Sequence, residues 1–424
     1  MAVMTARLLL ATMLATSVSA APTVFVHPGV VVGSADLASA RQRLAAKVEP
    51  TVSFVASARA LAQGRVDYVP TGPPENGTIS CGYYDKPNIG CSTQMDDADA
   101  AYTQALLFAI TGEAGLGQAS RHIISLYSAG LKRYTNNTAG GCCGNEALQA
   151  AWVGAKFVRT AELLRHTPGS GWTQPDTEAF SKMMYEVHVP LLIDGTPANG
   201  NWMASYIEAL IGTAVFSENA TLYDHAVALW RRRMPSYWYI TADGALPPVN
   251  PQPNCKPQPY CEWYNQTVFN ASTNGICQET CRDMGHMQMG FAAFLNGAMT
   301  ATLQGDDLGA EQKERFFAAS EFAASIVGGT RNGSDPIFCN GRTDVVNGHV
   351  IRGIKGGEAP TFEIAHKLFV RLGMDDLQTR THLTQKHGVR DLYRKAGEFY
   401  ICGPWETISH GLPIESDDGT SYSV

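Results

Sequence analysis

The segment QETCRDMGHMQMGFAAFLNGAMTATL, residues 278–303, combines a polar opening with a long apolar run. The apolar half has the composition of a buried helix. In the polar half, Arg282 and His286 stand four residues apart, and positions four apart share one face of a helix. Glu279 lies about one turn before Arg282, and Gln288 lies two residues after His286. The pattern predicts a buried helix whose first turns carry reactive side chains.

An arginine and a histidine on the same helix face suit chemistry on an acidic substrate. The planar guanidinium of Arg282 can grip a carboxylate, and the imidazole of His286 can exchange a proton near neutral pH. A structural interpretation stays open, because such a pair also occurs on solvated helix faces and in buried side-chain contacts. In that case Arg282 forms an ion pair with Glu279 or Asp283 and has no catalytic role.

Composition excludes several classes of function. The chain has 424 residues, of which 45% are hydrophobic and 17% are charged, and this balance is typical of a large folded core. The formal net charge of -7 argues against nucleic-acid binding, which calls for a basic surface. An anionic polymer would therefore be met by a local basic site. Neither a phosphate-binding glycine loop nor a dinucleotide fingerprint occurs, so we expect no cofactor.

The first twenty residues are typical of a secretory signal peptide. Arg7 precedes a short apolar run, and small residues end the segment at Val18–Ala20. No later run reaches the roughly 18 apolar residues that a membrane helix requires. We expect residues 21–424 to form a single domain that is secreted, extracellular and monomeric. The N-x-S/T sequons, which support secretion weakly, are Asn76, Asn136, Asn219, Asn265, Asn270 and Asn332.

Ten cysteines, all beyond residue 80, agree with an oxidising compartment and predict disulfides. Cys81 and Cys91 are expected to pin a loop over residues 64–96. A further bridge is expected to tie either the loop of Cys255 and Cys261 or the segment of Cys277 and Cys281 close to the candidate site. The spacing of Cys277 and Cys281 would also suit zinc, but secretion favours disulfides, so we expect no metal.

Most of the chain shows helical periodicity, with hardly any alternation of period two. Short turns rich in Gly, Pro or Asn separate the helical segments. Residues 243–275 break the pattern with prolines and predict a long functional loop. This order predicts an all-α fold of antiparallel helix pairs arranged as a layered α/α toroid. The predicted helices cover residues 34–45, 51–63, 97–113, 116–132, 145–166, 175–192, 201–217, 220–235, 278–303, 307–329, 359–373 and 383–397.

Several of these segments, taken in order, resemble the alginate-lyase-like polysaccharide lyases, with the glucuronan and alginate lyases most similar. The resemblance covers about residues 96–372 and rests on DADAAYTQALLFAITGE, NEALQAAWVGAKFVRTAELL, GNWMASYIEALIGTAVF, CRDMGHMQMG and TFEIAHKLFVRLG. It implies an incomplete (α/α)6–7 toroid that cleaves a β-1,4-linked polyuronate by β-elimination. The cysteines and the proline-rich insertion depart from bacterial members of the family.

The resemblance also implies roles for particular residues. Asn201 would bind the substrate carboxylate, although an asparagine at a helix start also suits a cap. Arg282 would neutralise the same carboxylate, His286 would act as the base, and Tyr264 or Tyr260 would act as the acid. The remaining candidates for substrate binding are Trp202, Tyr206, Gln288, Glu279 and His366; for the two aromatic residues and His366, a role in the core is the alternative.

Two other functions stay open at this point. A glycoside hydrolase on a similar toroid would need two opposed carboxylates. Its candidate carboxylates are Glu208, Glu279, Asp283 and Glu358. A non-catalytic carbohydrate-binding protein could use the same cleft. The basic run Arg231–Arg233 fits the rim of a cleft for an acidic polymer, and fits a solvated helix end equally well.

Overall fold

A computed structural model of the chain describes most of the predicted helices, while residues 359–361 and 388–397 of the last two lie outside the described residues. The described residues are 22, 24–82, 87–135, 144–198, 200–253, 255–264, 266–341, 343–346, 349–352, 362–387 and 405–412. The predicted signal peptide, Cys142, Cys143, Cys402 and Glu358 lie outside them. Within the described residues, no helix has both the length and the apolarity that crossing a membrane requires.

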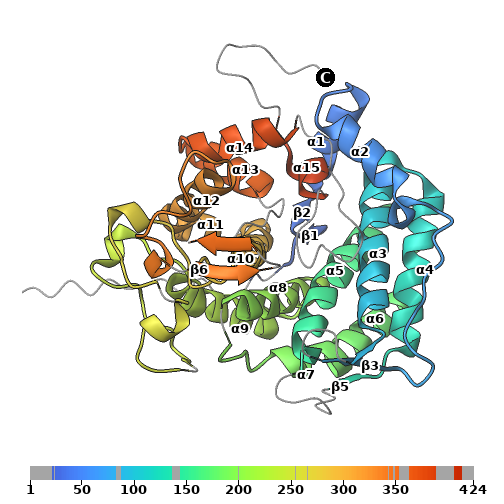
Figure 1. The fold of residues 1–424 in the computed structure, drawn as a ribbon. Helices are drawn as coiled ribbons and strands as arrows, with labels where there is room; N and C mark the ends of the chain where they lie inside the picture. Colours follow the sequence, from blue (N-terminus) through green and yellow to red (C-terminus); the bar gives the residue numbers. More distant parts are fainter. Residues whose placement is uncertain are drawn as a thin grey trace, which may run out of the picture.

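Long buried helices line the inside of a ring of helices (Figure 1). Consecutive members of this set pack side by side, α3 on α5, α5 on α8 and α8 on α10. Most residues of these helices are buried, which explains why their apolar residues are spread around the helix and are not confined to one stripe. Their bounds are α3 (Cys91–Thr111), α5 (Glu146–His166), α8 (Gly200–Phe216) and α10 (Met284–Leu303).

The inner helices run in the same direction. At one end, the Gln149 side chain near the start of α5 donates to the carbonyl of Cys91, the first residue of α3. At the other end, Arg165 near the end of α5 donates to the carbonyl of Phe216, which ends α8. The N-termini of these helices therefore gather at one end of the ring, where their dipoles favour negative charge.

An outer layer and a second group of helices complete the ring (Figure 1). The helix α4 packs on α3, α9 packs on α8, and α1 joins α3 to α15. The all-α toroid predicted from the sequence is confirmed, whereas the single domain over residues 21–424 stays a prediction. The bounds are α1 (Ser34–Ala45), α2 (Thr51–Ala60), α4 (Ala114–Gly130), α6 (Gln174–Met183), α7 (Val189–Leu192), α9 (Ala220–Arg233), α11 (Leu308–Glu311), α12 (Lys313–Val327), α13 (Phe362–Leu372), α14 (Leu377–His387) and α15 (Trp405–His410).

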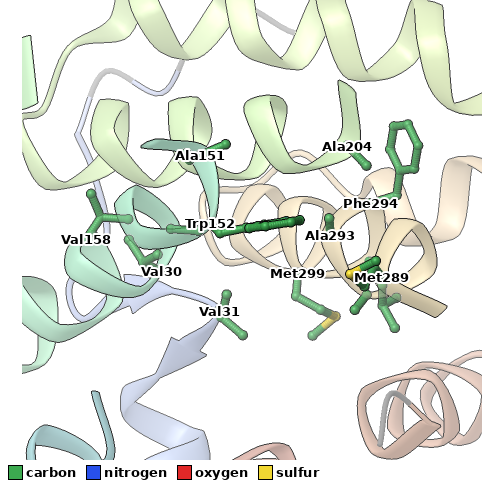
Figure 2. Packing of buried hydrophobic residues seen from close by; sticks show 14 of the residues in the cluster. Val30, Val31, Ala151, Trp152, Val158, Ala204, Met289, Ala293, Phe294 and Met299 are labelled. Carbon is green, nitrogen blue, oxygen red and sulfur yellow. The ribbon is translucent and has the colours of Figure 1, made fainter. Parts of the chain in front are cut away.

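The segment before α1 enters the ring and covers the C-terminal ends of the inner helices. It contains the short strands β1 (Gly29–Val30) and β2 (Val32–Gly33). The amide of Val31 donates to Thr300 near the end of α10. Val30 packs against Val158, and Figure 2 shows both with Trp152 and Ala293 in the buried layer between the helices. This segment therefore belongs to the core.

Short strands and irregular loops make up the rest of the described chain. As the sequence predicts, residues 243–275 form a loop with only short 3-10 turns. The strands are β3 (Thr78–Cys81), β4 (Asn88–Ile89), β5 (Arg133–Thr135), β6 (Thr343–Val346) and β7 (His349–Arg352). The 3-10 turns are η1 (Ala62–Gly64), η4 (Met234–Ser236), η5 (Thr241–Asp243), η6 (Tyr260–Glu262), η7 (Ala271–Thr273) and η8 (Cys339–Gly341), and η3 (Met184–His188) is a π-helical turn.

The disulfides confirm part of the cysteine prediction. Cys81 pairs with Cys91, as expected, and Cys255 pairs with Cys261. The expectation that every cysteine is oxidised is wrong for Cys277, whose thiol is free and buried. Cys281, in the same segment, pairs with Cys339, 58 residues further along the chain. Cys281 is therefore not available for the alternative zinc site.

A buried histidine links the π-helical turn to the start of α5. The Nδ1 atom of His188 lies 2.9 Å from the carbonyl oxygen of Ala150, and its ring meets the edge of Tyr134. Burial lowers the pKa of His188 to about 4, although the bond to Ala150 opposes this shift. The neutral imidazole is therefore part of the fold at pH 7.

We predict that His188 makes the fold sensitive to acid. The unfolded chain binds a proton at His188 near pH 6.5, whereas the folded chain does so only near pH 4. The free energy of unfolding should therefore fall as the pH drops through this window, by up to about 3 kcal/mol from this residue. Urea unfolding at pH 7.0 and pH 4.5 measures the loss, which should be smaller in His188→Gln. Equal pH dependence in the two proteins would contradict the assignment.

Candidate active site

The helix α10 begins later than the sequence suggests, because Asp283 caps it. The Asp283 carboxylate accepts a hydrogen bond from the amide of His286 at 2.8 Å, and α10 starts at Met284. Arg282 therefore lies in the turn before the helix. The prediction that Arg282 and His286 share a helix face is wrong, although both side chains lie at the start of α10.

The carboxylate of Glu279 is the centre of this region. It is fully buried and accepts hydrogen bonds from the amide nitrogen of Asn201 at 2.6 Å and 2.7 Å. It also accepts from the Tyr237 hydroxyl at 2.7 Å and from Arg282 Nη1 at 3.1 Å. Burying a carboxylate is costly unless donors and an opposite charge surround it, and these residues provide both. Glu279 thereby connects the first turn of α8 with the turn before α10.

Arg282 keeps its charge and remains half-exposed. Burial lowers the pKa of the guanidinium, but the charges of Glu279, Tyr264 and Asp283 and the hydrogen bond to Glu279 together raise it above its ordinary value. The Arg282 side chain is 26% exposed, so the guanidinium joins the buried carboxylate to the surface. The ion pair with Glu279, which the sequence left as an alternative, is therefore present, and it leaves other N–H groups of the guanidinium for a ligand.

Sequence reasoning missed Tyr237. This residue follows the end of α9 and is almost fully buried, and its hydroxyl donates to Glu279. Burial, with Cys277 and Glu279 nearby, raises the pKa of Tyr237 well above its ordinary value, so the phenol stays protonated. Two glycines make room for it. A Cβ at Gly200 would lie 2.0 Å from the Tyr237 ring, and one at Gly290 would lie 2.4 Å from its hydroxyl oxygen.

His286 and Asp283 form a carboxylate–imidazole pair. The Nδ1 atom of His286 lies 2.8 Å and 2.7 Å from the two Asp283 carboxylate oxygens. Because a carboxylate only accepts, Nδ1 carries the hydrogen and Nε2 carries the lone pair. Burial alone would raise the pKa of Asp283, but the hydrogen bonds and charge of His286 outweigh burial and lower it. The side chain of His286 is 30% exposed, so the pair has the orientation of a general base that a ligand can reach.

The two candidate tyrosines lie in the long loop before this cluster. Tyr260 is 40% exposed and its ring packs near Phe269, at 6.4 Å between centroids. Tyr264 is 37% exposed and close enough to Arg282 to affect its pKa. The backbone of Tyr264 has φ 46°, a strained value for an aromatic residue, and such strain gathers at functional sites. The loop is tied to the site, because Glu262 accepts from the side chain of Gln278.

The other predicted substrate-binding residues lie deeper. Trp202 is half-buried, whereas Tyr206 and Gln288 are almost fully buried. The ring of Tyr206 therefore belongs to the core. His366 lies on α13 and its Nδ1 bonds Asp376 at 2.6 Å, in agreement with the structural alternative. Part of the basic run at the end of α9 is engaged in ion pairs, since Arg231 pairs with Glu311 and Asp306.

The carboxylates that a hydrolase would use are already engaged. Glu208 is buried and paired with Arg159. Burial raises the pKa of Glu208 to about 7, against the opposing effect of Arg159. Glu279 is hydrogen-bonded within the core, and Asp283 is bound to His286. Among the described residues, therefore, each of these candidate carboxylates serves a cation or a helix cap.

No protein-family model and no curated protein sequence matches this chain. Solved structures do match it. Alginate lyase A1-III from Sphingomonas species A1 superposes with a TM-score of 0.56 at 14% sequence identity, covering 92% of this chain and 98% of that one. A variant of alginate lyase A1-III complexed with a tetrasaccharide gives a TM-score of 0.58 at 14% identity, covering 91% and 96%.

A second A1-III variant with a tetrasaccharide matches at a TM-score of 0.51 and 15% identity, covering 71% of this chain and 78% of that chain. At this identity the likeness establishes a shared fold. The resemblance noted in the sequence is thus confirmed for the α/α toroid. The roles of individual site residues stay predictions.

We predict that Gly290→Ala disrupts the cluster around Glu279. The added methyl group would collide with the Tyr237 hydroxyl and displace it from the carboxylate, at a cost of about 1–3 kcal/mol in the free energy of unfolding. Gly297→Ala on the same helix is the matched control, because its Cβ would meet its nearest neighbours at 3.5 Å. Chemical denaturation compares the two variants. Equal stability would show that Tyr237 does not depend on Gly290.

Proposed function

We propose that this protein is a secreted polysaccharide lyase that cleaves a 4-linked polyuronate by β-elimination and leaves a 4,5-unsaturated uronic acid at the new end. The observation that carries the proposal is the Asp283–His286 pair beside the Arg282–Glu279 ion pair at the start of α10. The toroid shared with alginate lyases and the gathered N-termini of the inner helices support it.

The reaction requires three groups around one sugar ring. A positive group must neutralise the C6 carboxylate, because the C5 proton is otherwise too weakly acidic to remove. A base then takes the C5 proton, and the electrons of the C5–H bond form the C4–C5 double bond. As the C4–O4 bond breaks, an acid protonates the departing O4. All electrons come from the substrate, so the reaction needs no oxidant or reductant.

The described side chains fit these requirements. Arg282 would hold the C6 carboxylate with the guanidinium N–H groups that face outward. The Nε2 atom of His286 would take the C5 proton, with Asp283 stabilising the resulting imidazolium. Tyr264 is our choice for the acid over Tyr260, because Tyr264 contributes to the raised pKa of Arg282 and has the strained backbone that gathers at functional sites.

The buried part of the cluster would position these groups. The amide nitrogen of Asn201 donates to Glu279, so in this arrangement Asn201 orients the ion pair and does not itself hold the substrate carboxylate. Tyr237 would have the same role, because its hydroxyl also donates to Glu279. Together they fix the Arg282 guanidinium before a substrate arrives, and such preorganisation lowers the barrier to reaction.

We predict that Asp283→Asn and His286→Ala both lose turnover while folded molecules persist. Removing the base should cost about 10²–10⁴ in rate. An asparagine at position 283 still caps α10 but can bind the other tautomer of His286, which would leave Nε2 protonated. Near-ultraviolet absorbance of the unsaturated product measures turnover, and thermal unfolding measures the folded fraction.

The matched control for this experiment is His225→Ala. His225 is an exposed helical histidine that bonds the carbonyl of Ile193 on the outer layer, and its removal should leave turnover unchanged. If His286→Ala retains more than about a tenth of wild-type turnover, His286 is not the base. Saccharide binding that persists in the wild-type protein with no product would instead indicate a non-catalytic carbohydrate-binding protein.

We further predict faster cleavage of glucuronan and polymannuronate than of polyguluronate. In glucuronate and mannuronate, H5 and O4 leave from the same side of the ring, so one compact cluster can serve both atoms. Guluronate needs base and acid on opposite faces. His286 follows Arg282 by four residues at the start of α10, and Tyr264 affects the pKa of Arg282, which suits the compact case. Initial rates on the three polymers at equal uronate concentration test this prediction. Faster cleavage of polyguluronate than of the other two polymers would contradict it.

A further inference from the structure

A second cluster of reactive side chains lies at the opposite end of the inner helices. It consists of His27 in the segment before β1, and of Glu162 and His166 in the last turns of α5. The proposed active site is at the start of α8 and α10, whereas this cluster is where α5 ends, beside the N-terminal segment that enters the ring (Figure 1). The proposed lyase mechanism uses none of these three residues.

Hydrogen bonds already orient two of the three side chains. The Nδ1 atom of His27 lies 2.6 Å from Glu162 Oε1, and the same oxygen accepts from the amide of Gly29 at 2.9 Å. Since the carboxylate only accepts, Nδ1 of His27 carries the hydrogen and Nε2 carries the lone pair. For both residues to bind one ion, the Glu162 carboxylate would have to turn from His27 Nδ1 toward that ion.

The outward atoms of the cluster lack partners. His27 Nε2, Glu162 Oε2 and His166 Nε2 are all buried, and none has a hydrogen-bond partner among the described residues. Unpaired buried acceptors are rare in folded proteins and call for an explanation. Moreover, the two imidazoles are stacked, with ring centroids 4.3 Å apart, next to a carboxylate that is 1% exposed.

We propose that His27, Glu162 and His166 bind a divalent transition-metal ion of the zinc class. Two imidazole nitrogens and a carboxylate oxygen are a donor set that zinc prefers. One ligand atom from each residue lies within 4.8 Å of the others, and Glu162 Oε2 is 3.8 Å from His166 Nε2. Tetrahedral zinc needs ligand spacings of about 3.3 Å, so rotations of the side chains would close the site.

A fourth ligand is within reach. Glu218, which follows α8, has Oε1 3.7 Å from His27 Nε2, and its side chain is 54% exposed. An exposed carboxylate can turn toward the ion at little cost, and water can fill the position instead. The ion would connect the N-terminal segment to the end of α5, and through Glu218 to the end of α8. Its role would therefore be to fasten the segment that covers this end of the ring.

Metal binding to the untagged full-length mature protein tests the proposal. After treatment with a chelator, the protein should take up a single Zn²⁺ per chain in a calorimetric titration, and Zn²⁺ should raise the melting temperature because the ion binds the folded state. Co²⁺, used as a probe, should give the visible absorption bands of a nitrogen- and oxygen-ligated ion. Both readouts are independent of lyase activity.

His166→Gln is the informative variant. The hydrogen bonds that hold the N-terminal segment to α5 run through Glu162 and His27, so removing the His166 ring should leave the fold intact. Its Zn²⁺ affinity should fall by at least about tenfold, as for loss of an important metal-site group. His122→Gln, at an exposed position on α4, is the matched control and should bind Zn²⁺ like the wild type.

The proposal is overturned if the wild type takes up no Zn²⁺ at micromolar concentration, or if His166→Gln binds as tightly as the wild type. Either result would mean that His27 and Glu162 form only a hydrogen-bonded pair. Failure here leaves the proposed lyase site untouched, because the two clusters share no residue.

Discussion

The buried carboxylate of Glu279 is the constraint on which the candidate site depends. A fully buried negative charge persists only when donors and a cation surround it, and here Asn201, Tyr237 and Arg282 do so. These partners come from the start of α8, the chain after α9 and the turn before α10. The hydrogen bonds and the ion pair that one buried carboxylate requires thus set the relative positions of three segments. It also sets the position of the guanidinium that would meet an acidic sugar.

Much of the fold could be predicted from the sequence because its determinants are local. Helical periodicity and the turns between segments indicate the toroid, and a proline-rich composition marks the loop over residues 243–275. The bridges Cys81–Cys91 and Cys255–Cys261 close short loops, so they too could be predicted from the sequence. For the candidate site, the sequence indicated that His286, Arg282, Asn201 and Glu279 lie close together. Hydrogen bonds of Glu279 connect the last three.

The rest depends on contacts between distant residues. Asp283 caps α10, so the helix starts after Arg282. The sequence alone does not show whether such an aspartate caps a helix or pairs with a cation. Tyr237 could be suspected only from the glycines at 200 and 290, whose purpose is visible once the ring lies against them. His27 and Glu162 are 135 residues apart, so no spacing rule joins them. Cys281 likewise bonds Cys339 and leaves Cys277 free.

The central claim is that this cluster breaks the glycosidic bond by elimination and not by hydrolysis. The most direct test is digestion of polymannuronate or glucuronan in water enriched in ¹⁸O, with mass spectrometry of the fragments. Elimination takes no oxygen from solvent, so we expect unlabelled fragments, each new non-reducing end lighter by one water than a hydrolysis product. Fragments that carry ¹⁸O at the new reducing end from the moment of cleavage, with no unsaturated end, would contradict the account.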